Sequence, residues 1–510
     1  MTRPAPIIVT WAKVVGFQGA GFVVAMITVA LAAMVFPPHV YGLYGLLLSL
    51  VQIVAGVGTS WVNLAALRYG REEFTRDGTI RLTAGSTILL QGALLAFLGF
   101  LFVTTLPSLA RHFLAEANIG PLLAFILAGL LTAQVAADSA NYLAQATNRF
   151  TGYGLGHLIG RSGPAVAVLL VVMGVPINAL VLLGGAGVGW MLAAIFTLRS
   201  IPPELKYPLG LDPLLIRQML AYGWRLPLAS IASVAMTWMD VWFIKAFVGI
   251  GAAGTYAWAS SVFNLLTVGL IAFSAVLAPR LIDLHLRQNP KHIAEGGRTI
   301  AALFALAVAL MPMALAAVRA GGILGLPSSY TSAAGPLALL VAASAFQFLT
   351  FMVGPLVVSN EKLIGAVALQ SIVMLGVNTA GNAVLVPLLA GEGAALSKIL
   401  AVAIGAVSYY RFMRQACEGA EELPPRLQTI ILISIALFII AVVVSLAPPR
   451  IAVFLSLLSS AIFLLILRQT GLFHDLLGVV PYVSPLPAPM RVPLEIILTS
   501  LAGRKKGAGV

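Results

Sequence analysis

The chain has 510 residues, of which 60% are hydrophobic and only 9% are charged, and its mean hydropathy is +1.01. Soluble domains carry about 25% charged residues, so this composition excludes a soluble protein, and its uniformity along the chain excludes one with a single membrane anchor. A net charge of +13 would favour a nucleic-acid partner in a soluble protein, but no basic segment here is large enough to fold separately. Basic residues of a membrane protein collect in cytoplasmic loops beside anionic lipid, so we expect membrane lipids and no nucleic acid as partners.

Apolar stretches long enough to cross a bilayer, about 20 residues each, predict fourteen transmembrane helices. Six lie near residues 11–35, 42–66, 82–106, 119–143, 154–174 and 177–198, and six more lie near 219–247, 254–278, 299–318, 334–358, 364–387 and 393–413. Two further helices follow near 428–447 and 451–467. The predicted domains are an N-terminal lobe (1–200), a cytoplasmic linker (201–218), a C-terminal lobe (219–414), a loop with the last two helices (415–467) and a cytoplasmic tail (468–510).

The distribution of lysine and arginine predicts the orientation of these helices. With a cytoplasmic N-terminus, 23 of the 30 basic residues fall in cytoplasmic segments, and only Arg111, Arg319 and Arg450 fall outside. Four more lie within helices. Because cytoplasmic loops are enriched in basic residues, both termini are expected in the cytoplasm.

The second and eighth predicted helices repeat each other at an offset of 212 residues. The matches include Gly42 with Gly254, Tyr44 with Tyr256, and Arg68 with Arg280. Six helices separate the two copies, so each copy crosses the membrane in the same direction. The fold class expected is therefore all-α and integral to the membrane, with two parallel six-helix lobes around a central cavity plus two C-terminal helices.

Three segments carry a resemblance to a known family. The segment from Tyr222, YGWRLPLASIASVAMTWMDVWFIKAFVGIGAAGTYAWASSV, resembles the seventh and eighth helices of polysaccharide-biosynthesis flippases of the O-antigen and exopolysaccharide type. LAQATNRF (Leu143 to Phe150) and GNAVLVPLLAGEGAALSKIL (Gly381 to Leu400) resemble two connections of the same family. These flippases belong to the multidrug/oligosaccharidyl-lipid/polysaccharide exporter superfamily.

This resemblance implies a transporter of the bacterial inner membrane. The expected activity is movement of an undecaprenyl-diphosphate-linked oligosaccharide from the inner to the outer leaflet by alternating access, for lipopolysaccharide or exopolysaccharide assembly. A polysaccharide polymerase and chain-length machinery would be its protein partners. No cofactor and no metal site is expected.

Charges within the predicted helices are the candidate functional residues, because a buried charge in a membrane faces protein or water. Arg161 and Arg225, one from each lobe, are the leading candidates for binding a diphosphate, since guanidinium offers paired donors to phosphate oxygens. Arg68 and Arg280, at the inner ends of the repeated helices, are candidates for the same role. Asp138 is expected either to pair with Arg161 or to border an anion site formed by it.

The remaining candidates concern a gate and the sugar. Asp240 and Lys245 indicate an ion pair or gate near the outer end of the seventh helix, and Lys398 is a candidate partner for Asp240. Neutral polar residues within the helices could contact sugar hydroxyls or join helices to each other. The four candidates for sugar contacts are Gln52, Asn264, Gln370 and Asn378.

Other functions fit the sequence less well. A membrane glycosyltransferase or polymerase needs acid or base groups near its substrate, and only Asp138, Asp240 and His157 lie within helices, so we predict no enzyme and no catalytic residues. Lipid II flippases carry basic residues within the cavity on helices one, two and eight. Here helix one has only Lys13 at its inner end, and helices two and eight are uncharged until Arg68 and Arg280. Cation-coupled drug exporters place an acidic residue in helix one, and the first predicted helix of this chain contains none.

Overall fold

All regular structure in the described part of the chain is helical. The computed structural model describes residues 7–113, 121–223, 227–266, 327–359, 361–416 and 447–469, with isolated positions at 312–316 and 436–444. The first six helices are α1 (Ile7–Val35), α2 (Pro38–Asp77), α3 (Arg81–Phe113), α4 (Pro121–Ala146), α5 (Phe150–Val172) and α6 (Ala179–Ser200). Next come α7 (Pro203–Lys206), α8 (Pro213–Gly223), α9 (Pro227–Phe247), α10 (Ile250–Leu266), the 3-10 helix η1 (Ser328–Ala333), α13 (Ala334–Ser359), α14 (Glu361–Ala416) and α16 (Pro449–Gln469).

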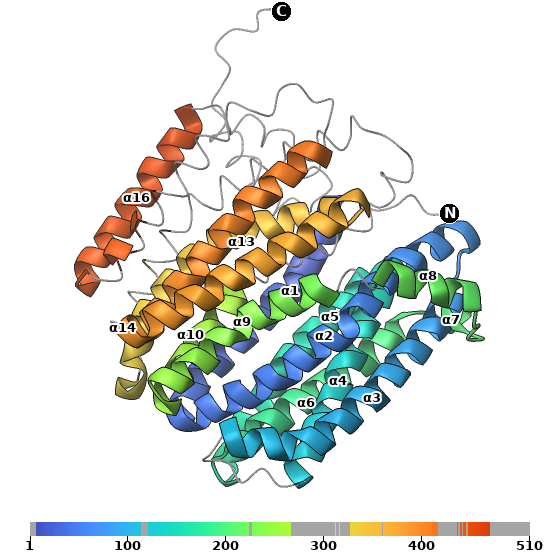
Figure 1. Cartoon of the computed structure of the whole chain (residues 1–510), viewed down its shortest axis with the longest axis horizontal. Coiled ribbons are helices and arrows are strands. Elements are labelled where there is room, and N and C mark those ends of the chain that lie inside the picture. The colour runs from blue at the N-terminus through green and yellow to red at the C-terminus, as the bar shows by residue number, and fades with distance from the viewer. Residues whose placement is uncertain are drawn as a thin grey trace, which may run out of the picture.

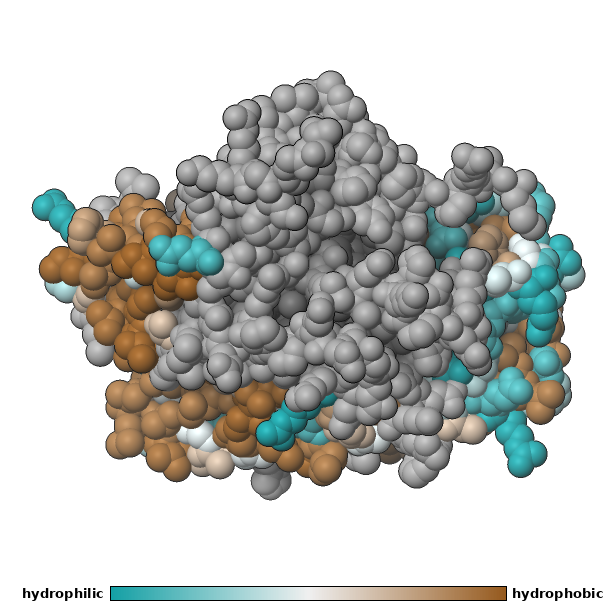
Figure 2. Space-filling view, turned by 90° about the horizontal axis from the view of Figure 1, so that it is seen from above, coloured by the Kyte–Doolittle hydropathy of each residue, from teal (hydrophilic) through white to brown (hydrophobic). Residues whose placement is uncertain are grey.

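The helices are suited to a bilayer by length and by surface. Six of those described, α2 to α6 and α14, are long and apolar enough to cross a membrane. Large side chains such as Phe97, Phe100 and Leu369 are more than half exposed, which only a lipid environment makes favourable. Hydrophobic residues cover much of the described surface in Figure 2, whereas hydrophilic ones gather toward the end where α7 and α8 lie. The predicted all-α membrane fold is confirmed in these residues.

The helices form two lobes that meet along α2. In one lobe α5 packs on α1 and α6, and α4 packs on α6 and α2; in the other, α14 packs on α9 and α13, and α10 packs on α13. Figure 1 shows α2 and α9 in the middle, with α13 and α14 on one flank and α3, α4 and α6 on the other. The predicted ninth helix, 299–318, and most of the thirteenth, 428–447, lie outside the described residues.

The repeated helices α2 and α10 touch each other at equivalent residues. A Cβ atom on Gly42 would collide with the carbonyl oxygen of Ile250, and one on Gly254 would collide with that of Pro38, so only glycine permits this approach. One turn further, a Cβ atom added to Gly45 would lie 2.9 Å from the Cβ of Ala257. Gly42 with Gly254 and Gly45 with Ala257 keep the sequence offset of 212, so the pseudo-symmetry axis passes between α2 and α10.

Helix α9 packs on α2 in antiparallel register and adds hydrogen bonds between the lobes. The Trp238 indole donates to Gln52 Oε1 at 2.8 Å, and the Trp242 indole donates to Ser49 Oγ at 2.9 Å. Three further bonds join Trp258 to the Val29 carbonyl, Tyr330 to the Phe36 carbonyl and Tyr41 to Ser261. Together they close the lobes on each other at the end that carries the α1–α2 and α9–α10 turns, which is the predicted outer end.

Two predicted helices, 364–387 and 393–413, form the single element α14, which folds back on itself at Ala390. This residue has a φ of 48° and a ψ of −123°, and Pro387 precedes it inside the element. Residues on either side of the reversal then meet, as when Gln370 Nε2 donates to the Gly405 carbonyl at 3.1 Å. The close approach of Gly381 to Ser397 lies nearer the turn. The two predicted spans are thus present as an antiparallel pair.

The predicted linker, 201–218, is more ordered than its composition indicates. It contains α7 and most of α8, which pack on the α2–α3 turn: Ile80 N donates to the Leu205 carbonyl at 2.8 Å, and Gly210 N donates to the Arg81 carbonyl at 3.2 Å. The predicted seventh helix, 219–247, corresponds to the last residues of α8, up to Gly223, and to α9 from Pro227 onward, while residues 224–226 lie outside the described part of the chain.

Candidate functional site

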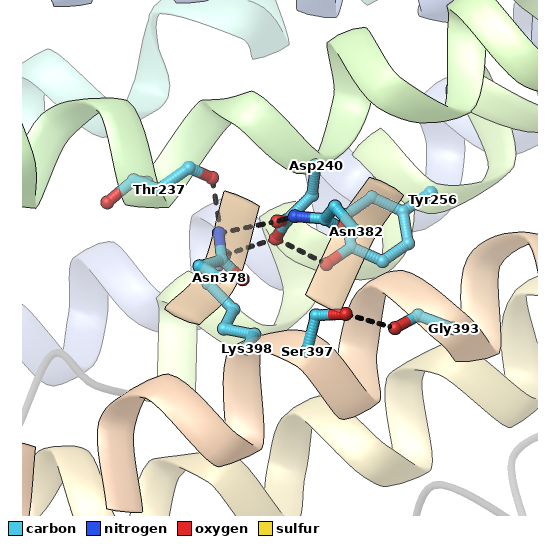
Figure 3. A network of polar contacts seen from close by, with 8 residues as sticks. All are labelled: Thr237, Asp240, Tyr256, Asn378, Asn382, Gly393, Ser397 and Lys398. Atoms are coloured by element: carbon cyan, nitrogen blue, oxygen red, sulfur yellow. Dashed lines mark hydrogen bonds and ion pairs between the residues drawn. The ribbon is translucent and has the colours of Figure 1, made fainter. Parts of the chain in front are cut away.

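Asp240 lies at the centre of a buried polar network in the C-terminal lobe. Its side chain is fully buried, and both carboxylate oxygens accept two hydrogen bonds each (Figure 3). The Tyr256 hydroxyl and the Lys398 ammonium donate to Oδ2 at 2.8 Å and 3.0 Å. The Asn378 and Asn382 carboxamides donate to Oδ1 at 3.0 Å and 2.8 Å. Four donors on one carboxylate fix this side chain in position.

The helical arrangement explains how these residues meet. Asn378 and Asn382 are four residues apart in the first half of α14, so they share one face. The reversal at Ala390 brings Lys398, in the second half, back beside that face. Lys398 Nζ also donates to the Thr237 carbonyl at 3.2 Å, one turn before Asp240 on α9. The network therefore joins α9, α10 and both halves of α14.

Two outcomes follow for the predicted residues of this lobe. The partnership of Asp240 with Lys398 is confirmed, at 3.0 Å between Nζ and Oδ2. The amide nitrogen of Asn378, predicted to contact sugar, is bound to Asp240 instead. Lys245 lies half-buried in the last turn of α9. Asn382 was missed because a neutral amide in a membrane helix usually joins helices, although its spacing from Asn378 was a readable signal.

Of the other three candidates for sugar contacts, two form hydrogen bonds within the protein. The Gln52 carboxamide oxygen accepts the Trp238 bond between the lobes, and the Gln370 amide nitrogen joins the two halves of α14. Asn264 lies half-buried near the end of the described part of α10. Gln52 and Gln370 therefore join helices to each other, which is the alternative role predicted from the sequence.

Arg161, on α5 of the N-terminal lobe, differs from Lys398 in that part of its cationic group has no partner. Its guanidinium Nη1 is buried and has no hydrogen-bond partner. Asp138 on α4 lies half-buried, and the two form no ion pair within 4.0 Å, so the predicted Asp138–Arg161 pair is wrong. The reason is packing, since α5 lies mainly against α1 and α6 and touches α4 only lightly. On the same helix the Tyr153 and His157 rings meet edge to face, with centroids 4.5 Å apart.

Of the other three arginines predicted to bind the diphosphate, only Arg68 lies in the described part of the chain. Arg68 Nε donates to Glu72 Oε1 at 3.3 Å, and its guanidinium lies 4.9 Å from the ring centroid of Tyr222 on α8. It is therefore held between α2 and α8 by an ion pair and a cation–π contact. Arg225 and Arg280 lie outside the described residues.

Comparison with known proteins places this arrangement in a family. The family model described as "Polysaccharide biosynthesis protein" matches residues 10–285, more than half of the chain. The chain belongs to the polysaccharide biosynthesis protein family. The matched region includes α1 to α10, and with them Arg161, Asp240 and the α2–α10 contact. A search of curated proteins finds no match.

Solved transporters share the fold of this family member. A structure of the lipid II flippase MurJ in an inward closed conformation has a TM-score of 0.56 at 14% identity, covering 89% of this chain and 99% of its own. A Vibrio cholerae MATE transporter, VcmN, has a TM-score of 0.56 at 12% identity, covering 81% and 97%. An outward-facing multidrug resistance MATE transporter of the MOP superfamily has 0.56 at 13%, covering 82% and 98%. At such identities the likeness shows the fold alone, which is that of membrane transporters.

Proposed function

We propose that this family member moves an undecaprenyl-diphosphate-linked oligosaccharide from the inner to the outer leaflet of the bacterial inner membrane. The observation that carries the proposal is the family match, since the family is described by polysaccharide biosynthesis and the fold is one of transporters rather than enzymes. A lipid-linked sugar needs a path in which its polar head passes through protein while its tail stays in lipid. Two lobes that separate and close in turn provide such a path.

Arg161 is the proposed contact for the diphosphate in the N-terminal lobe. A buried guanidinium nitrogen without a partner is costly in a membrane protein, and an anionic ligand would relieve that cost. Guanidinium binds phosphate oxygens through two parallel bonds, which a lysine cannot reproduce. Arg225 is proposed to supply the second cation from the C-terminal lobe, with Arg68 and Arg280 nearer the cytoplasm. Asn264 is proposed to contact the sugar.

The proposal includes the motion of the lobes, the orientation in the membrane and the proteins that receive the product. Lobes 1–200 and 219–414 would rock against each other and open the α2–α10 contact at the outer end, while 415–467 and the tail 468–510 lie outside the repeat. Both termini would lie in the cytoplasm, and the product would pass to a polysaccharide polymerase and its chain-length machinery for lipopolysaccharide or exopolysaccharide assembly. The closed contact at the predicted outer end then corresponds to a state that receives substrate from the cytoplasmic leaflet.

The test is flipping of a lipid-linked oligosaccharide in proteoliposomes with matched protein amounts. Arg161→Ala should slow flipping about ten-fold or more, because a hydrogen bond to a charged group contributes about 1.5–3 kcal/mol. Arg161→Lys should recover part of the rate. Arg217→Ala removes an exposed arginine of α8 and is the matched control, expected to flip at the parental rate. Parental rates in both Arg161 variants would show that this charge does not bind the headgroup.

The same assay separates the related transport functions. Proteoliposomes loaded with lipid II, or with a drug in place of the oligosaccharide lipid, measure the activities named for the two groups of solved structures that share this fold. We expect transport of the oligosaccharide lipid only. Faster transport of lipid II would reassign the substrate while leaving the lobe mechanism in place.

A further inference from the structure

The Asp240 network surrounds its carboxylate with oxygen atoms of the kind that bind alkali cations. Besides the two carboxylate oxygens, it contains the Tyr256 hydroxyl, the Thr237 carbonyl and the carboxamide oxygens of Asn378 and Asn382. Hard oxygen ligands of this kind suit hard cations. Both carboxamide oxygens are buried and have no hydrogen-bond partner.

Two unpartnered acceptors beside a buried carboxylate are unusual, because buried polar atoms are nearly always bonded. A carboxamide can turn its oxygen to where its nitrogen now lies, so each asparagine could present either a donor or an acceptor to this centre. In the structure both present the donor, and the positive charge comes from Lys398. Its ammonium lies 3.0 Å from Asp240 Oδ2 and 3.2 Å from the Thr237 carbonyl, and its side chain is 5% exposed.

We propose that Lys398 is a covalently attached cation that permanently fills a monovalent-cation site in the C-terminal lobe. One ammonium balances one carboxylate, so the buried centre is neutral. A second cation would add an uncompensated charge away from water, which costs several kcal/mol. This site accordingly binds no dissolved alkali cation in the natural protein, and a sodium gradient does not act on transport through it.

Removal of the lysine ammonium should convert this centre into a true cation site. In Lys398→Ala the carboxylate remains, the space of the side chain opens, and the two carboxamides are free to turn their oxygens inward. A small monovalent cation, Na⁺ or methylammonium, should then bind where the lysine ammonium was. The proposal rests on the contacts around Asp240 and does not depend on which lipid is carried.

The test is the melting temperature of the purified full-length protein in detergent, at equal ionic strength in sodium, methylammonium or choline chloride. The natural protein should melt at the same temperature in all three salts. Lys398→Ala should melt lower in choline and rise by about 2 °C or more in sodium or methylammonium, because a ligand that binds only the folded state stabilises it. The double variant Asp240→Asn, Lys398→Ala lacks the carboxylate and should show no such rise.

Two results would overturn the proposal. One is a specific rise of the natural protein's melting temperature in sodium over choline, which needs no variant and therefore stands even if Lys398→Ala does not fold. The other is a Lys398→Ala response no larger than that of the double variant. Since the readout is stability, failure of the flipping assay would leave this result unaffected. Flipping by the natural protein should also be equally fast with and without sodium on either side of the membrane.

Discussion

The buried Lys398 and the half-buried Arg161 differ in the number of partners that their cationic groups have. Lys398 meets a carboxylate that is itself held by three other donors, so its charge is neutralised within the lobe. Arg161 keeps a buried guanidinium nitrogen with no partner, and the nearest acid expected from sequence, Asp138, forms no ion pair with it. The first arrangement neutralises a buried charge within the protein, and the second is the one for which we propose binding of an anion.

Asn382 offers a test of the Asp240 network at a residue that touches no other proposed site. Asn382→Ala removes one of the four donors to a fully buried carboxylate, so we expect the free energy of unfolding to fall by about 1.5–3 kcal/mol. The measurement is titration from mild detergent micelles into a denaturing detergent, followed by loss of helical signal. Ser371→Ala is the matched control, since its hydroxyl bonds only to the Val367 carbonyl of its own helix. Equal losses in both variants would show that the network contributes no special stability.

For single residues, the sequence predicted the contacts of charged side chains better than those of neutral polar ones. Charges are rare in membrane helices, so Asp240 and Lys398 could be paired from their positions alone. Asn382 carries no such signal, because neutral amides commonly join helices and their partners depend on rotation about the helix axis. The same dependence explains why the Asp138–Arg161 pair was wrong: neighbours along the chain need not present facing side chains.

Among the elements, α2 and α10 carry the contact between the lobes. Their approach depends on the absence of a side chain at Gly254, where a Cβ atom would collide with the Pro38 carbonyl. Gly254→Ala should therefore push the helices apart and cost about 1–3 kcal/mol of unfolding free energy, as overpacking does. Gly251→Ala lies on the same helix with open space around it and is the matched control. Equal melting temperatures of the two variants would contradict this packing.

Helix positions followed from apolar length, whereas helix ends and connections depended on packing that the sequence does not display. The predicted spans 154–174, 177–198, 334–358, 364–387 and 393–413 correspond closely to α5, α6, α13 and the two halves of α14. The linker, by contrast, packs against α2 and α3 through the buried Ile201 and the partly buried Leu205 and Leu215, and a short amphipathic segment of this kind is easily interpreted as a loop. The partner that orders it, the α2–α3 turn, lies more than 100 residues earlier in the chain.

For the whole molecule, the orientation in the membrane is the first quantity to check. Helix α2 has 40 residues, about 60 Å at 1.5 Å per residue, so its charged end extends well beyond a hydrocarbon core of about 30 Å. Arg76 at that end and Arg450 at the start of α16 are both exposed and are predicted on opposite sides. In a Cys417→Ser background, Arg76→Cys should label only from the cytoplasm and Arg450→Cys only from outside. The same sidedness for both would overturn the odd number of helices, eleven, that is predicted between them.

The two lobes touch at the predicted outer end, and transport by alternating access requires this contact to open. Gly45 and Ala257 are equivalent residues of the two lobes, and a Cβ on Gly45 would lie 2.9 Å from that of Ala257. A disulfide spans about 3.5–4.5 Å between Cβ atoms, so a small outward shift of the two helices would accommodate one. In the Cys417→Ser background, the pair Gly45→Cys, Ala257→Cys should form a disulfide on oxidation and lock the lobes together there. Flipping in proteoliposomes should then fall to the level of protein-free vesicles and return when the bond is reduced. Each single cysteine variant should flip at the same rate under both conditions. Full flipping by the oxidised, cross-linked protein would show that α2 and α10 do not separate during transport.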